Sequence, residues 1–104
     1  MIHVFATVKI RAGCLEQALD CYRYLVPEVM EYEPGCLDYV PTTDLDLGLP
    51  NQDRNGCTIF VSERWKSEED FRAHLLMAHC IEFRKRITPY LDEGIRVRVT
   101  QPVI

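Results

Sequence analysis

Two hydrophobic periodicities follow one another at the start of the chain and limit the folds that it can adopt. Residues 2–10 alternate, which predicts a strand whose buried face carries Ile2, Val4, Ala6, Val8 and Ile10. Residues 14–32 instead repeat apolar side chains at steps of three and four, which predicts an amphipathic helix with a stripe of Leu15, Leu19, Tyr22, Val26 and Val29. Pro27 falls inside this helix, where we expect it to kink the helix or to interrupt its hydrogen bonds.

The remaining residues continue the alternation of element types. Strands are predicted at 36–42 and 57–65, and the loop 43–56 between them is longer than the usual hairpin connection. Ser67, with an acid three residues later, is typical of a capped helix N-terminus. The helical segment that starts there is expected to run to about residue 91, with a break near residues 78–79. A last strand is predicted at 94–100.

This order of elements, βαββαβ, predicts an α+β fold of the ferredoxin-like type. In this arrangement four antiparallel strands form one sheet and both helices cover the same face. With 104 residues, the chain is expected to form one domain, residues 1–104. The opposite face of the sheet keeps apolar side chains such as Phe5 and Phe60. We therefore expect a second copy to cover it in a twofold-symmetric homodimer.

Composition excludes several classes of protein. The chain has 12 Lys and Arg against 16 Asp and Glu, a net charge of −4, whereas a nucleic-acid-binding domain usually carries a basic excess. No apolar run reaches the roughly 18 residues that a membrane span requires, so no membrane partner is expected. The 5 cysteines are odd in number and include no C-x-x-C pair, which disfavours a disulfide framework. The sequence therefore predicts a cytoplasmic protein with reduced thiols.

Three short motifs, in this order and spacing, resemble one known family. They are Glu33-Pro34-Gly35-Cys36 before a strand, Glu63-Arg64-Trp65 at a strand end, and Ser67, Phe71, His74 and His79 in the helical segment. Together they resemble the antibiotic biosynthesis monooxygenase (ABM) superfamily, closest to its quinol monooxygenase branch, over about residues 2–100. The resemblance implies a single ABM-like domain that forms a dimeric α/β barrel. Several members oxidise phenols, anthrones or quinols with O₂ and use neither metal nor flavin.

His74, His79 and Glu63 are the candidate catalytic residues. His74 lies on the apolar face of its predicted helix, where it is either a core histidine or a base that takes a proton from a phenolic hydroxyl. A helix break near His79 would turn both rings toward one cavity; otherwise His79 is a cap or a surface residue. Glu63 alternates with apolar residues, so we expect it either to orient one of the histidines or to pair with Arg96 or Arg98.

Four aromatic residues are candidates for contact with a substrate. Trp65 ends its strand and, by the resemblance, lines the cavity as an aromatic wall; core packing is the alternative. Tyr39, on the second strand, and Tyr32, near the end of the first helix, are weaker candidates for hydroxyl partners. Phe83 lies on the apolar face of the last helical turns. The expected partner of these residues is a small aromatic molecule.

No metal and no cofactor is expected from the sequence. His74 and His79 lack the i, i+4 spacing of a zinc-binding helix pair, and no third ligand is near them in sequence. The haem-degrading members of the family usually carry an asparagine in the first strand. The stretch 4–7 has none, which disfavours haem degradation.

The sequence therefore favours a cofactor-independent monooxygenase that oxidises a small aromatic or quinol substrate with O₂. Two alternatives stay open: an isomerase of a small polar metabolite, with or without a phosphate group, and a dimeric ligand-binding module without catalysis. An apolar cavity would favour the quinol. Several arginines that point inward would favour a phosphorylated substrate.

Overall fold

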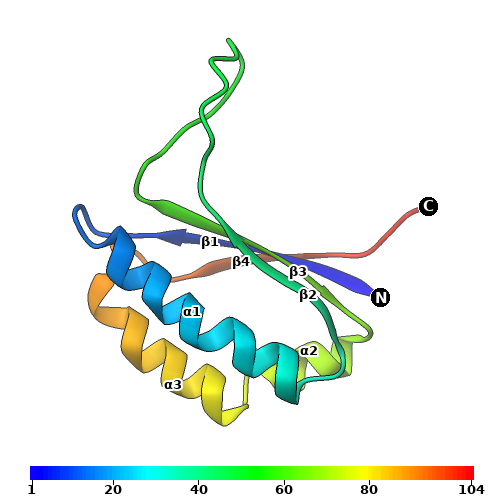
Figure 1. The fold of residues 1–104 in the computed structure, drawn as a ribbon. Helices are drawn as coiled ribbons and strands as arrows, with labels where there is room; N and C mark the ends of the chain where they lie inside the picture. The colour runs from blue at the N-terminus through cyan, green and yellow to red at the C-terminus, as the bar shows by residue number, and fades with distance from the viewer.

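The computed structural model describes residues 1–104. Its elements, in chain order, are β1 (Ile2–Lys9), α1 (Leu15–Tyr32), β2 (Cys36–Thr42), β3 (Thr58–Trp65), α2 (Glu68–His74), α3 (Ala78–Ile87), the 3-10 turn η1 (Thr88–Tyr90) and β4 (Arg96–Thr100). The strands form one antiparallel sheet in the order β2-β3-β1-β4. All helices lie on the same face of this sheet (Figure 1). The ferredoxin-like prediction is confirmed.

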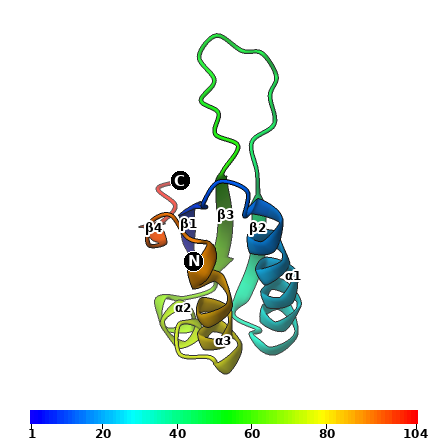
Figure 2. The ribbon, with the colours of Figure 1, turned by 90° about the vertical axis from the view of Figure 1, so that its left-hand side faces the viewer.

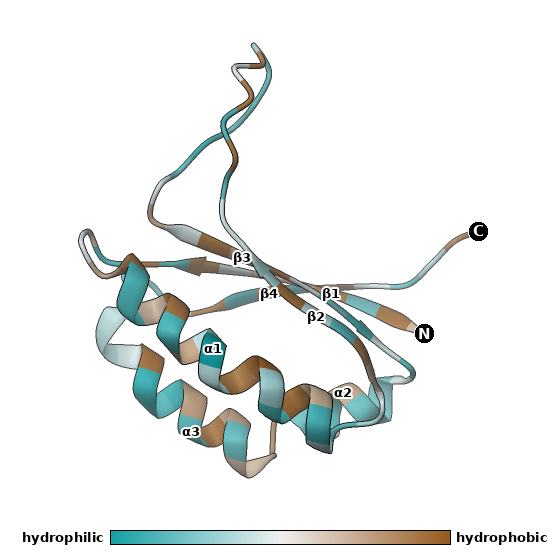
Figure 3. Cartoon of the chain, viewed as in Figure 1, coloured by the Kyte–Doolittle hydropathy of each residue, from teal (hydrophilic) through white to brown (hydrophobic).

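The core lies between the helices and the inner face of the sheet. The predicted alternation of β1 is confirmed, because Val4, Ala6 and Val8 are buried while Phe5 and Lys9 are exposed. Apolar and polar segments alternate along the helices as well (Figure 3), so each helix presents an apolar side to the sheet. The largest side chains that are fully removed from solvent are Trp65, Leu25, Ile59 and Ile87.

Helix α1 buries a stripe that is rotated slightly from the predicted one. Its buried residues are Ala18, Cys21, Tyr22, Leu25 and Val29. Leu15, Leu19 and Val26, which the periodicity placed in the stripe, lie half-buried at its border. Pro27 does not end the helix, since α1 continues to Tyr32. Pro27 is exposed, so the carbonyl group that it leaves without a donor can bond water.

The helical segment after Ser67 is two helices rather than one. The capped start is confirmed, because Ser67 Oγ accepts a hydrogen bond from the Asp70 amide at 3.1 Å. Residues 75–77 separate α2 from α3, three residues before the expected break, and Met77 is extended. A short non-helical connection therefore lies between His74, the last residue of α2, and His79, the second residue of α3. This break, and not helical spacing, decides how the two histidines lie relative to each other.

Residues 43–57 form a long arm that extends beyond the sheet from the ends of β2 and β3 (Figure 2). Its base is held by Cys57, whose carbonyl accepts a hydrogen bond from the Ile10 amide. Other hydrogen bonds are internal: the Gln52 side chain bonds the backbone of Leu45 and Leu47, and Asp44 accepts from the Asn55 amide. Leu45, Leu47 and Leu49 are exposed. No residue of the arm lines the cavity described below, so the position of the arm does not support a role as a cover for the cavity mouth.

Replacing Gly35 with alanine is expected to destabilise the fold by about 1–3 kcal/mol. A Cβ atom at Gly35 would lie 2.6 Å from Asp70 Cβ and 2.3 Å from Asp70 Cγ, and Asp70 is held by the cap of α2. The matched control is Gly56→Ala, because a Cβ atom there meets nothing within 4 Å. Urea unfolding of the two variants checks the prediction, which fails when both lose the same free energy of unfolding.

All 5 cysteines are free thiols in the structure. Cys21, Cys36 and Cys80 are buried, and Cys14 and Cys57 are half-buried. Burial raises the pKa of the Cys36 thiol to about 12, with further increases from the carboxylates of Glu63 and Glu33. Among the helices, none is both long and apolar enough to span a membrane.

Candidate functional site

Three buried side chains meet where α1, α2 and α3 come together. Glu33 is the residue that ends α1, His74 is the last residue of α2, and His79 is the second residue of α3. Their exposed fractions are 7%, 3% and 7%. A buried carboxylate is costly unless it is paired, so the two rings around Glu33 account for its place in the interior.

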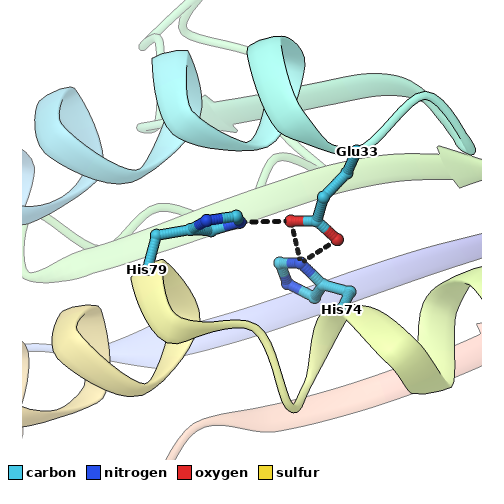
Figure 4. Close-up of side chains that lie close together, drawn as sticks. All are labelled: Glu33, His74 and His79. Atoms are coloured by element: carbon cyan, nitrogen blue, oxygen red, sulfur yellow. Dashed lines mark hydrogen bonds and ion pairs between the residues drawn. The ribbon is translucent and has the colours of Figure 1, made fainter.

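Both histidines bond the same carboxylate (Figure 4). Nδ1 of His74 lies 2.9 Å from Glu33 Oε2 and 3.1 Å from Oε1. Nε2 of His79 lies 2.5 Å from Glu33 Oε2. A carboxylate can only accept, so the two ring nitrogens that face Glu33 carry protons. Glu33 thereby fixes the orientation of both rings and the tautomer of each neutral ring.

The other nitrogen of His74 is left free to accept a proton. With the proton on Nδ1, Nε2 carries the lone pair, and it lies 3.7 Å from Cys80 Sγ. Burial lowers the pKa of His74, and the hydrogen bond that its ring donates to Glu33 opposes this shift. The ring is therefore neutral at neutral pH. This is the state in which an imidazole acts as a base.

His74 lines a cavity between the helices and the sheet, and so does Cys80, whose Sγ lies near Nε2. The cavity has a volume of about 130 Å³, close to the roughly 150 Å³ apolar cavity that holds a benzene molecule in a well-studied case. Its wall is mostly hydrophobic, and its polar members are few; besides His74, it includes Tyr39, Glu63, Phe71, Cys80 and Phe83. Arg84 is the one cationic residue of the wall, and its guanidinium already bonds Cys80 Sγ and the Leu75 carbonyl.

Glu63 is the second buried carboxyl group of the site. It accepts a hydrogen bond from Trp65 Nε1 at 3.0 Å. Burial raises its pKa to about 7, the Trp65 hydrogen bond lowers it in part, and the charge of Glu33 raises it further. The predicted pairing with Arg96 or Arg98 is wrong. In the register, Glu63 is opposite Val4, whereas these arginines are opposite Thr7 and Phe5, on the outer face of the sheet.

The raised pKa of Glu63 predicts a loss of stability as pH rises. Below pH 4.5 the carboxyl is protonated in both states; above it the unfolded chain ionises first, while the folded chain keeps its proton to about pH 7. The free energy of unfolding should therefore fall by about 2–3 kcal/mol across this interval through Glu63 alone.

Glu63→Gln is expected to remove this loss, because the amide oxygen keeps the Trp65 hydrogen bond and cannot ionise. His74, whose pKa is lowered, acts in the opposite direction below pH 6.5, so the informative quantity is the difference between the variant and the unmodified protein. Urea unfolding at several pH values from 4.5 to 8 measures it. A difference that does not change with pH would contradict the assignment.

The comparisons with known proteins agree with this architecture. The family model described as antibiotic biosynthesis monooxygenase matches residues 1–86. The chain belongs to the antibiotic biosynthesis monooxygenase (ABM) family. The resemblance seen in the sequence motifs is thereby confirmed. A search of curated proteins gives no match.

Solved structures share the ABM fold at low sequence identity. A protein from Nitrosomonas europaea assigned to the antibiotic biosynthesis monooxygenases aligns at 15% identity and a TM-score of 0.86, over 100% of both chains. A protein from Caulobacter crescentus CB15 with the same assignment aligns at 19% identity and a TM-score of 0.84, over 99% of this chain and 90% of its own. A conserved protein from Methanosarcina mazei Go1 aligns at 21% identity and a TM-score of 0.82, over 96% of this chain and 90% of its own. These identities establish the fold alone.

Of the four aromatic residues predicted to contact a substrate, two line the cavity of the ABM chain and two do not. Tyr39 and Phe83 line the cavity, as a substrate contact requires. Trp65 has no exposed surface and lies behind His74, with ring centroids 4.8 Å apart. Tyr32 is 61% exposed, with its ring 6.5 Å from that of His79. Neither Trp65 nor Tyr32 belongs to the cavity wall, so they do not touch a molecule bound there.

Glu33 is the residue of the ABM site that sequence reasoning missed. Glu33 entered the sequence analysis only as part of the Glu33-Pro34-Gly35-Cys36 motif, and the orienting role was expected of Glu63. The structure gives the contact with both histidines to Glu33. The sequence did contain a sign of this role. An acid at the C-terminal end of a helix interacts unfavourably with the helix dipole, so its presence there suggests a role other than stabilising the helix.

The same three residues also offer a set of metal-binding atoms. One atom from each of Glu33, His74 and His79 lies within 4.8 Å of the others. The sequence expectation considered only ligands near the histidines along the chain, and Glu33 is 41 residues away from His74. The fold supplies the third donor that the spacing lacked.

Proposed function

We propose that this ABM-family chain is a cofactor-independent monooxygenase that oxidises a single-ring quinol or phenol with O₂. The observation that carries the proposal is the arrangement of His74. Its Nδ1 is held by Glu33, its ring lines an apolar cavity, and its Nε2 lies beside Cys80 of the same wall. This arrangement is that of a general base whose tautomer is set by a carboxylate.

The proposed reaction begins with proton transfer from a substrate hydroxyl to His74 Nε2. The resulting anion is electron-rich and reduces O₂ directly. One oxygen atom enters the ring and the other leaves as water, so a quinol and O₂ give a hydroxylated quinone and water. Glu63 and Tyr39 face the same cavity and provide polar contacts for the second oxygen of the quinol. The hydrophobic wall keeps water away from the reactive anion.

The cavity favours a quinol over a phosphorylated metabolite. A phosphate group needs several cationic or amide donors, whereas Arg84 is the one cation of the wall and its guanidinium is already bonded. The volume of about 130 Å³ fits one aromatic ring and is smaller than the roughly 300 Å³ at which drug-sized pockets begin. A polycyclic substrate such as an anthrone is therefore disfavoured.

A homodimer is part of the same proposal. Phe5, Val40 and Phe60 are exposed on the outer face of the sheet, and Val97 and Val99 of β4 are exposed at its edge. Exposed apolar patches of this kind mark interfaces in soluble proteins. We propose that a second copy covers the sheet, and that the dimer is cytoplasmic, since the 5 thiols are free. Analytical ultracentrifugation is expected to give twice the chain mass, and Phe60→Asp to shift it toward the monomer.

Oxygen uptake by chelator-treated protein tests the proposed function. The panel contains a single-ring quinol, an anthrone and a sugar phosphate, each with a protein-free control for spontaneous oxidation. We expect uptake with the quinol, little with the anthrone, and no turnover of the sugar phosphate in the absence of O₂. Turnover of the sugar phosphate under anaerobic conditions would replace the proposal with an isomerase. No uptake with any quinol would argue against oxygenation.

A further inference from the structure

We propose that Glu33, His74 and His79 form a binding site for one divalent transition-metal ion of the Zn²⁺ type. The ligands would be the Glu33 carboxylate, His74 Nδ1 and His79 Nε2. The reaction proposed above needs no metal, so the site is an additional property of the same cluster. It stands on the positions of the three side chains and not on any activity.

The donor atoms already lie near the spacing that such an ion requires. The two nitrogen–oxygen distances are 2.9 and 2.5 Å, and all three donor atoms lie within 4.8 Å of one another. Bonds of about 2.1 Å at tetrahedral angles place ligand atoms roughly 3.4 Å apart. Small changes of side-chain torsion reach this spacing. The backbone need not move, because each ligand lies at the end or the start of a helix.

The kind of donor selects the kind of ion. Two imidazole nitrogens and one carboxylate suit Zn²⁺, Co²⁺ or Fe²⁺, whereas Ca²⁺ and Mg²⁺ prefer all-oxygen sites. Three protein ligands leave a fourth position for water. The three side chains are 93% or more removed from solvent, so little side-chain freedom is lost when the ion binds. The ion would also offset the buried negative charge of Glu33.

Metal binding would reverse the hydrogen-bonding role of His74 toward the cavity. The ion takes the lone pair of Nδ1, so the single proton of the neutral ring must sit on Nε2. Nε2 is the atom near Cys80 and the cavity. When a metal ion is bound to Nδ1, Nε2 of His74 therefore donates a hydrogen bond, whereas in the metal-free ring Nε2 accepts one. This step rests on the proposed function and predicts that Zn²⁺ inhibits quinol oxidation.

Binding is tested on the full chain after chelator treatment. Co²⁺ is titrated while visible absorption is recorded, and Zn²⁺ is then added to displace it. We expect saturation at one equivalent and loss of the signal with Zn²⁺. ¹⁵N spectra of the histidine rings in the unmodified protein locate the ion: with Zn²⁺, His74 should be bound through Nδ1 and His79 through Nε2, while His3 is unchanged. Binding through other nitrogens, or to the thiols, would overturn the proposal.

Variants give an independent test of the same site. Loss of an outer-shell partner already costs about 10–100-fold in metal affinity, so Glu33→Gln and His79→Gln, which remove ligands, should cost at least as much. His3→Gln, on β1 and away from the cluster, is the matched control and should bind as before. Circular dichroism checks the fold, and the ¹⁵N spectra decide the question where a variant does not fold. Equal affinity in Glu33→Gln and His3→Gln would overturn the proposal.

The outcomes separate the two proposals. One equivalent of metal on the three ligands, without oxygen uptake by the chelated protein, supports the metal site and contradicts the monooxygenase. Oxygen uptake without metal binding at the cluster supports the monooxygenase and contradicts the metal site. Uptake that Zn²⁺ suppresses, and that a chelator restores, supports both.

Discussion

Replacing His74 with alanine is expected to lower the rate of quinol oxidation by about 10²–10⁴-fold, the usual contribution of a positioned base. In the proposed reaction no other group accepts the substrate proton from the position of His74 Nε2. His79 does not replace it, because His79 is not part of the cavity wall and its Nε2 is bonded to Glu33. The measurement is oxygen uptake under saturating quinol, with the variant and the unmodified protein treated with chelator in parallel.

Two controls accompany the His74→Ala variant. His3→Ala, on β1 and remote from the cavity, should keep the full rate. Added imidazole should restore part of the activity of His74→Ala, because the truncation leaves room beside Glu33 for a free ring. A variant that folds, as judged by circular dichroism, and retains the full rate would remove His74 from the proposed mechanism.

Replacing Trp65 with alanine is expected to cost about 3–5 kcal/mol of the free energy of unfolding, out of the roughly 5–15 kcal/mol that a domain possesses. Trp65 has no exposed surface, and its ring packs against Phe71 and His74. The truncation leaves a large void and also removes the hydrogen bond to Glu63. Chemical denaturation of the variant, followed by circular dichroism, measures the loss.

Trp65→Phe separates packing from hydrogen bonding. It keeps an aromatic ring in the core and removes the Nε1 donor, so it should cost only about 1–3 kcal/mol, the penalty of a buried polar group left without its partner. The loss in Trp65→Phe should grow with pH, since Glu63 is increasingly ionised above pH 7. Equal losses in the alanine and phenylalanine variants would show that packing of the ring contributes little.

The fold could be predicted because each element carries its own periodicity. The alternation in β1 and the capped start of α2 depend on neighbouring residues alone, so local physics determines them. The continuation of α1 past Pro27 depends on the position of the proline, which the structure places on the solvent side of the helix. The break at 75–77 was expected near 78–79, because no proline or glycine marks it in the sequence.

The site was predicted in part, because it depends on contacts between distant residues. The buried position of His74 is confirmed, and of the two alternatives for His79 the surface position is wrong, but their partner Glu33 comes from the end of α1. The expected ion pair of Glu63 with Arg96 or Arg98 is inconsistent with the alternation of side chains along the last strand. The alternation of the last strand already assigned these arginines to the face opposite the inward valines. Glu63 lies on the inner face, so the pair would have had to cross the sheet.

The arm at residues 43–57 keeps a surface that could bind other molecules apart from the cavity and its chemistry. Beyond the bond from the Ile10 amide to Cys57 at its base, its hydrogen bonds are internal, and none of its residues belongs to the cavity wall. Insertions, deletions or grafted sequences in the arm therefore leave the chemistry of the cavity unchanged. The scaffold can thus acquire a new recognition surface at one end while the pocket evolves independently, which makes residues 43–57 the natural place to engineer tethering or a fused epitope.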